Sequence, residues 1–199
     1  YSFVNEPTAN TLEKIYSYIY RQGIRLSKAK SELFSENLKS KEILLYHGSK
    51  NGFSSIDKNG SRSDSDLSNG FYCSANLDAA ISFVEDVSNS SVYVYKADIS
   101  KYKIVELNCD LDWMLIISYY RRKLRQYENN SYIKNLISKL KGVDIIIAPI
   151  ADNKMFEILN QFANGDITSK QALHSLSASR LGKQYVFKTQ KAIDSLKFL

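Results

Sequence analysis

Apolar residues follow a helical spacing near the start of the chain. Between residues 11 and 37 they fall near the 3.6-residue period of an amphipathic helix, at Leu12, Ile15, Tyr16, Ile19, Leu26 and Leu33. The pattern predicts one or two helices, with a break at Gly23. We expect this segment to be an extension of a domain that begins later in the chain.

Short apolar runs and amphipathic stretches are interspersed through the rest of the chain. The short runs predict strands at 43–46, 70–74, 91–98, 103–107, 143–148 and 185–187. The amphipathic stretches predict helices from residue 77, over 111–127, 132–140, 153–163 and 169–178, and a short one at the C-terminus ending at Leu199. The helix from residue 77 has an expected apolar face of Leu77, Ala80, Ile81 and Val84.

Residues typical of helix starts and loops support this division. The predicted helices follow Asn76, Asp110, Ser131, Asp152 and the capping-box sequence Thr168-Ser169-Lys170-Gln171. The polar, turn-rich stretch 58–69 predicts a flexible loop.

The order of the elements indicates the fold class. The strands cluster without the regular strand–helix alternation of a doubly wound parallel sheet, so the sequence predicts an α+β fold. We find no internal repeat and no linker. We therefore predict one domain over residues 41–199, preceded by a helical N-terminal extension over residues 1–40.

The composition indicates a folded domain that favours anionic partners. Apolar residues make up 44% of the 199 residues and aromatic residues 12%, which excludes a disordered chain over most of the length. The net charge of +6 favours nucleic acid, a nucleotide diphosphate or an anionic protein surface, or serves solubility alone. A membrane span needs about 20 apolar residues. The longest apolar run, 143–150, is broken by Asp144, so we expect no span.

Cysteine usage bears on cofactors and location. Cys73 and Cys109 are too few for a disulfide framework, and no Cys/His spacing typical of a metal site occurs. The sequence therefore predicts no metal. It favours a cytoplasmic protein or a secreted, delivered effector with buried thiols.

Three short segments place candidate functional residues at the ends of predicted strands. Residues 45–49 (LYHGS) carry His47, followed by a glycine that lets a ligand approach the backbone closely. Residues 66–74 (DLSNGFYCS) carry Tyr72, and a late strand begins with Gln184. Taken alone, each residue also fits an ordinary structural role.

Together the three segments resemble the His-Tyr-Glu branch of the ADP-ribosyltransferases, which includes diphtheria toxin and the poly-ADP-ribose polymerases. More closely, the chain from Leu44 onward resembles a bacterial family of uncharacterised ADP-ribosyltransferase-like domains. The matching segments are His47-Gly48-Ser49, Asp66 to Tyr72, Ile150-Ala151-Asp152-Asn153 and Gln184 to Phe187. The resemblance implies a split mixed or antiparallel sheet with surrounding helices, and NAD as co-substrate.

The resemblance also implies how these residues bind NAD. His47 would hold a ribose hydroxyl, and the backbone of the Gly48-Ser49 turn would grip the nicotinamide amide. Tyr72 would stack on the nicotinamide ring. Phe83, eleven residues later, would complete the sandwich, although it equally fits a helix residue that faces the core.

Arg62 is a further candidate, in the loop before the second strand. Its guanidinium could reach the pyrophosphate of NAD, or it is a solvated loop residue.

Gln184 would take the third catalytic position, where well-studied members often carry glutamate. Glutamine keeps a hydrogen bond to ribose but cannot act as a base near neutral pH. Either the acceptor needs no base here, or the domain binds NAD and transfers poorly. Asp152, Asp66 and Glu85 are alternative carboxylates. Ala80 replaces a serine of the poly-ADP-ribose relatives, so we expect single transfer.

The leading hypothesis is a mono-ADP-ribosyltransferase that acts on a protein or nucleic acid. By resemblance, it would be a bacterial toxin with an antitoxin, or an effector with an immunity protein. One alternative is a non-catalytic NAD- or ADP-ribose-binding module, favoured by Gln184. Another is a basic nucleic-acid-binding protein, favoured by the net charge and by the run 121–125 (RRKLR) beside Tyr119 and Tyr120. We expect His174 at the surface.

Overall fold

The computed structural model describes residues 8, 10, 11, 14, 15, 26–36, 38–84, 90–151, 153–177 and 182–199. The chain divides into two compact units, Tyr1–Lys39 and Ser40–Leu199. In the first unit, helix α2 (Leu26–Ser35) lies within the predicted helical segment. The predicted break at Gly23 falls outside the described residues.

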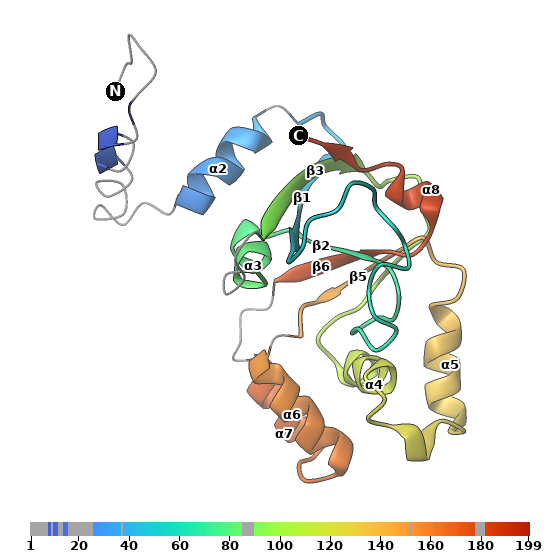
Figure 1. Cartoon of the computed structure of the whole chain (residues 1–199). Coiled ribbons are helices and arrows are strands. Elements are labelled where there is room, and N and C mark those ends of the chain that lie inside the picture. Colours follow the sequence, from blue (N-terminus) through green and yellow to red (C-terminus); the bar gives the residue numbers. More distant parts are fainter. Residues whose placement is uncertain are drawn as a thin grey trace. The chain divides into compact units, whose positions relative to one another are not determined.

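The second unit is built on one seven-stranded sheet with the order β4-β5-β6-β2-β1-β3-β7 (Figure 1). Its strands are β1 (Glu42–Ser49), β2 (Phe71–Ser74), β3 (Ser91–Asp98), β4 (Ile104–Glu106), β5 (Ile145–Pro149), β6 (Lys183–Phe187) and β7 (Lys197–Phe198). The strands pair antiparallel except β4 with β5, which are parallel. The sheet is therefore mixed, and the predicted α+β class is confirmed.

Polar side chains cap the first turn of several helices in this unit. They are α3 (Leu77–Ser82), α4 (Leu111–Tyr120), α5 (Ser131–Lys139), α6 (Asn153–Asn164), α7 (Ser169–Ser177) and α8 (Gln190–Ile193), with a 3₁₀ turn η1 (Arg125–Tyr127). Asn76 caps α3 and Asp110 caps α4, as predicted, through side-chain oxygens that accept from backbone N–H groups. Thr168 and Gln171 hydrogen-bond each other's backbone N–H, which confirms the capping box.

Three details of the helical predictions are wrong. Helix α4 ends at Tyr120 rather than at residue 127, because Arg122 takes a left-handed φ of 59°. Ile81 is 38% exposed and lies off the apolar face, since α3 buries only one side. The short C-terminal helix α8 ends at Ile193 rather than at Leu199, and the chain then pairs β7 with β3, so β6 is not the last strand.

The starts of α5 and α6 are the two remaining positions where the sequence predicts a helix cap. Asn130 rather than Ser131 caps α5, because its side chain accepts from Tyr132 N and Ile133 N. Asp152, the predicted cap of α6, lies outside the described residues.

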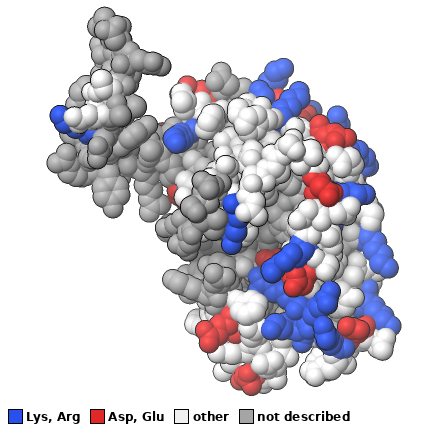
Figure 2. Space-filling model, in the orientation of Figure 1, with Lys and Arg blue, Asp and Glu red and all other residues white. Residues whose placement is uncertain are grey.

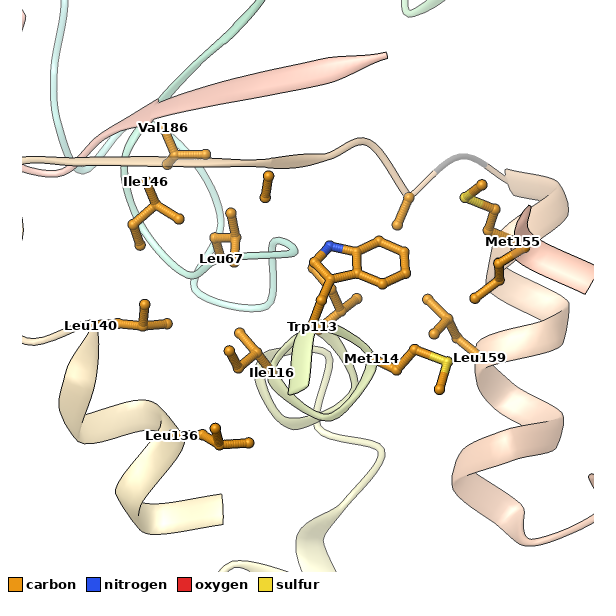
Figure 3. Packing of buried hydrophobic residues seen from close by; sticks show 14 of the residues in the cluster. Leu67, Trp113, Met114, Ile116, Leu136, Leu140, Ile146, Met155, Leu159 and Val186 are labelled. Atoms are coloured by element: carbon orange, nitrogen blue, oxygen red, sulfur yellow. The ribbon is translucent and has the colours of Figure 1, made fainter. Parts of the chain in front are cut away.

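Hydrophobic cores lie on both faces of the sheet. On one face, Trp113 and Met114 of α4 are fully buried: Trp113 lies beneath the strands that carry Ile146 and Val186, and Met114 points towards Leu159 of α6 (Figure 3). The opposite core is a cluster of Leu45, Phe71, Cys73, Tyr95, Ile145, Ile147, Phe187, Ala192 and Ile193. Apolar burial of this extent stabilises the sheet and holds β1, β2 and β6 in place.

The sheet changes direction between β1 and β2. Strand β1 pairs with β3 along its whole length, from Glu42↔Asp98 to Ser49↔Ser91, but is registered with β2 only at Tyr46↔Ser74. Figure 1 shows β1 and β3 crossing steeply over the direction of β2, β6 and β5. The candidate residues lie on the strands around this junction.

Candidate functional site

His47 connects the two strands where they separate. Its Nδ1 lies 2.6 Å from the backbone oxygen of Tyr72. Because a carbonyl oxygen can only accept, Nδ1 carries the proton and donates it. In the neutral ring, Nε2 is then the unprotonated nitrogen and acts as a hydrogen-bond acceptor.

Aromatic rings surround the imidazole of His47. Phe71 stacks on it with ring centroids 4.3 Å apart, and Phe53 meets it edge-on at 5.4 Å. Burial among these groups lowers the pKa of His47 below its ordinary value of 6.5, and the bond to Tyr72 opposes this shift. The ring is therefore neutral near pH 7.

Gly48 allows helix α3 to approach strand β1. A Cβ at this position would lie 2.4 Å from the backbone oxygen of Ala80 and 3.0 Å from Cγ1 of Val84. The missing side chain thus has a packing function here, beyond the predicted ligand approach. Ser49, the next residue, ends β1 and is half-buried opposite Ser91.

Phe83 lies at the C-terminal end of α3 and is 62% exposed. The alternative interpretation of this residue as part of the core is therefore wrong. The ammonium of Lys50 lies 5.2 Å from the ring centroid of Phe83. An exposed aromatic ring thus lies at the end of the helix that contacts Gly48.

Tyr72, in β2, uses its hydroxyl to hold the preceding loop. The phenol oxygen accepts from Leu67 N at 3.0 Å and donates to the backbone oxygen of Ser68 at 2.5 Å. Its half-buried ring packs against the core that contains Trp113. Burial raises the pKa of Tyr72, so the phenol stays protonated.

Gln184 lies in β6 and is only 7% exposed. It pairs with Ser74 on one side and with Ala148 on the other. Its Nε2 donates to the backbone oxygen of Pro149 at 3.0 Å, which identifies the nitrogen end of the amide. The amide nitrogen is therefore directed at β5, and the amide oxygen points away from it.

The three predicted catalytic residues thus come from adjacent strands. Successive side chains of a strand point to opposite faces of the sheet. With the observed register, Tyr72 and Gln184 point to one face and His47 points to the other. Among the described residues, no hydrogen bond joins the three side chains to one another, and the contact of His47 is to the main chain of Tyr72. The register therefore brings Tyr72 and Gln184 to one face and does not bring the His47 side chain to them.

The remaining charged candidates lie apart from His47 or are already paired. The Arg62 side chain is 85% exposed and lies 3.4 Å from Asp64. Asp66 forms an ion pair with Arg121 at 2.6 Å, so its carboxylate is engaged. Asp152 and Glu85 lie outside the described residues.

Lys188, which no sequence pattern singled out, supports the loop before β2. Its ammonium donates to the backbone oxygens of Leu67 (2.7 Å) and Asn69. Burial lowers the pKa of Lys188 to about 8. No sequence signal identifies such a role, because backbone carbonyls are present at every residue.

The described part of the chain contains no group of three His, Cys, Asp or Glu residues placed to hold a metal. Within the same residues, no helix has the length and apolar character to cross a membrane. Cys73 is buried and Cys109 half-buried, and both are free thiols.

The fold and site define an α+β protein with a mixed sheet and a neutral histidine at a strand junction. The chain belongs to the family described as "Protein of unknown function (DUF3990)", whose model matches residues 43–198. The match runs from the second residue of β1 to the end of β7. Neither a curated protein nor a solved structure matches the chain.

Proposed function

We propose that this protein is a mono-ADP-ribosyltransferase that uses NAD as substrate and a macromolecule as acceptor. The observation that carries the proposal is the neutral His47, which presents Nε2 as an acceptor at the junction of β1 and β2. A ribose hydroxyl is the donor that such a nitrogen fits. The single registered pair between β1 and β2 supports the split sheet of an ADP-ribosyltransferase-like fold.

The surroundings of Gly48 support a nicotinamide site. Of the two rings predicted to stack on nicotinamide, Phe83 offers an exposed flat face, whereas the half-buried ring of Tyr72 packs against the core that contains Trp113. Gly48 is buried against Ala80, and its missing side chain lets the helix that ends at Phe83 pack on β1. A stacked ring held by backbone groups would orient the bond that breaks.

The reaction requires positioning more than a strong base. The bond between ribose C1′ and the nicotinamide nitrogen breaks, and both electrons leave with neutral nicotinamide. A lone pair of the acceptor forms the new bond to C1′, and the acceptor loses one proton to water. Gln184 can hold a ribose hydroxyl through its oxygen but cannot take this proton. We therefore expect an acceptor that needs little deprotonation before attack.

The role of Phe83 can be tested with a matched pair of exposed phenylalanines. Because Phe83 and Phe198 are 62% and 68% exposed, replacing either with alanine should change the free energy of unfolding by only about 0.5 kcal/mol. Phe83→Ala should raise KM for NAD about tenfold, the loss expected for one aromatic stack. Phe198→Ala should leave KM unchanged. Release of nicotinamide from NAD measures both.

Two outcomes would contradict the proposal. Equal KM values for Phe83→Ala and Phe198→Ala would show that nicotinamide does not bind at the end of α3. If calorimetry detects NAD binding by the wild-type protein but no nicotinamide is released and no acceptor in a lysate is labelled, the protein is a binding module. The engaged amide of Gln184 is the observation that favours this second function.

A further inference from the structure

An open hollow of about 470 Å³ lies beside the end of α4. Its lining residues come from the loop before β2, the last turn of α4 and the segment after it: Ser63, Tyr119, Tyr120, Arg122, Arg125 and Glu128. The sequence predicted this basic run on a helix, but only Arg121 caps the helix and the other residues follow it.

Positive charge around the hollow exceeds negative charge. Asp64 is paired with Arg62, and Asp66 with Arg121. Arg122, Lys123 and Arg125 form no ion pair with any other described residue, and Glu128 is the one carboxylate that lines the hollow. Figure 2 shows Lys and Arg atoms gathered in this region, over α4 and the turn that follows it.

The backbone at Arg122 takes a conformation that favours glycine. Its φ of 59° lies in the left-handed region, at the helix-end position where glycine is usual. Arg122 N bonds to Tyr119 O, and Lys123 N to Ser118 O, both at 2.9 Å. A glycine would close this turn with less strain, so the turn does not explain an arginine. The Arg122 guanidinium instead donates to Ser63 Oγ at 3.3 Å, at the hollow.

Aromatic faces lie next to these cations. The rings of Tyr119 and Tyr120 meet edge-on with centroids 5.5 Å apart, and both residues are half-buried. Arginines that contact a phosphate backbone, alternating with aromatic faces that stack on bases, are the usual elements of a single-strand nucleic-acid site.

We propose that this hollow binds single-stranded nucleic acid, with phosphates on Arg122 and Arg125 and a base on a tyrosine face. Arg122 follows α4 and Arg125 begins η1, so the two lining arginines can contact successive phosphodiesters, each of which carries one charge. An acidic peptide would satisfy the arginines but would make no use of a stacking face.

The hollow is connected to the proposed transferase site by one loop. Arg122 bonds to Ser63 of this loop, and the Tyr72 hydroxyl bonds to Leu67 and Ser68 further along it. A nucleic-acid strand bound in the hollow would be the acceptor of the proposed transfer. That assignment rests on the proposed function, whereas binding of the strand does not.

Fluorescence anisotropy of a labelled single-stranded oligonucleotide, measured at several salt concentrations, tests the inference. Arg122→Gly should weaken binding and lower the slope of log K against log salt by about 0.7, the value for one phosphate contact. Because glycine suits the left-handed turn, the Tm of this variant should equal or exceed that of the wild type. Lys139→Gln, which removes an exposed cation from α5, should bind as the wild type does.

Each contrary result has its own meaning. No salt-dependent binding by the wild type, or unchanged binding by Arg122→Gly, would overturn the inference. If ADP-ribose displaces the oligonucleotide, the hollow binds the dinucleotide. If an acidic peptide with the same net charge as the oligonucleotide displaces it, the hollow binds a protein. If the strand binds but nicotinamide is never released from NAD, the proposed function fails and this inference stands.

Discussion

The side chain of His47 is the residue on which the proposed chemistry depends. Two features determine its state: the Tyr72 carbonyl that accepts from Nδ1, and the aromatic rings that exclude water around it. Burial among the rings favours the neutral ring over an imidazolium, whereas the bond to the Tyr72 carbonyl opposes that shift and fixes the tautomer in which Nε2 is the acceptor. A protonated His47 would lose the acceptor that the ribose hydroxyl requires.

The lowered pKa of His47 makes a prediction about stability. As the pH falls through 6.5, the unfolded chain takes up a proton before the folded chain does. The contribution of His47 is therefore fully present above 6.5 and is lost as the pH falls through the lower folded pKa. Each unit of pKa difference corresponds to about 1.4 kcal/mol.

Urea unfolding at a series of pH values measures this effect. Between about pH 7 and 5, the wild type should lose more of its free energy of unfolding than His47→Gln, which has no titrating ring at this position. Parallel curves for the two proteins would show that the imidazole is not desolvated in the folded state.

The packing of helix α3 against strand β1 forms the wall of the proposed nicotinamide site. The contact depends on Gly48, where an added Cβ would meet the Ala80 oxygen at 2.4 Å. Since backbone cannot move aside as a flexible side chain does, α3 would have to shift. Such a shift would also move Phe83, which ends the same helix.

We predict that Gly48→Ala lowers the free energy of unfolding by about 1–3 kcal/mol, as over-packing usually does. Ser49→Ala, one residue later in the same strand and half-buried, serves as the control and should change it by less than about 1 kcal/mol. Urea midpoints measure both. If Gly48→Ala is as stable as Ser49→Ala, α3 does not pack on β1 as closely as described.

Local signals predicted elements well, whereas contacts between distant segments could not be predicted. Asn76, Asp110 and the Thr168–Gln171 pair cap helices through residues within three positions, so sequence reveals them. The early end of α4 was missed because arginine rarely takes the left-handed conformation seen at Arg122.

In the candidate site too, the residues could be identified from local sequence, but their contacts with distant segments could not. The sequence predicted that His47, Tyr72 and Gln184 meet around one nicotinamide; the structure places them on adjacent strands, but His47 points to the opposite face of the sheet from the other two. It could not predict that the His47 partner is a backbone carbonyl, or that Gln184 bonds to Pro149. Their catalytic roles stay predictions.

In the whole second unit, a single sheet supports two separate surfaces. The junction of β1 and β2 carries the proposed NAD site, and the hollow beside α4 carries the proposed strand site. The loop between β1 and β2 connects them through Ser63, Leu67 and Ser68. The net charge of +6 suits an anionic substrate together with an anionic acceptor.

Release of nicotinamide from NAD by histidine variants tests the central claim most directly. The chain has two histidines, and His174 lies exposed on α7, so His174→Ala is the matched control for His47→Ala. With both variants confirmed as folded by their Tm, His47→Ala should lose about 100-fold or more in kcat/KM, equivalent to about 2.7 kcal/mol, and His174→Ala should match the wild type. Equal rates for all three proteins, or no release by any of them, would contradict the account.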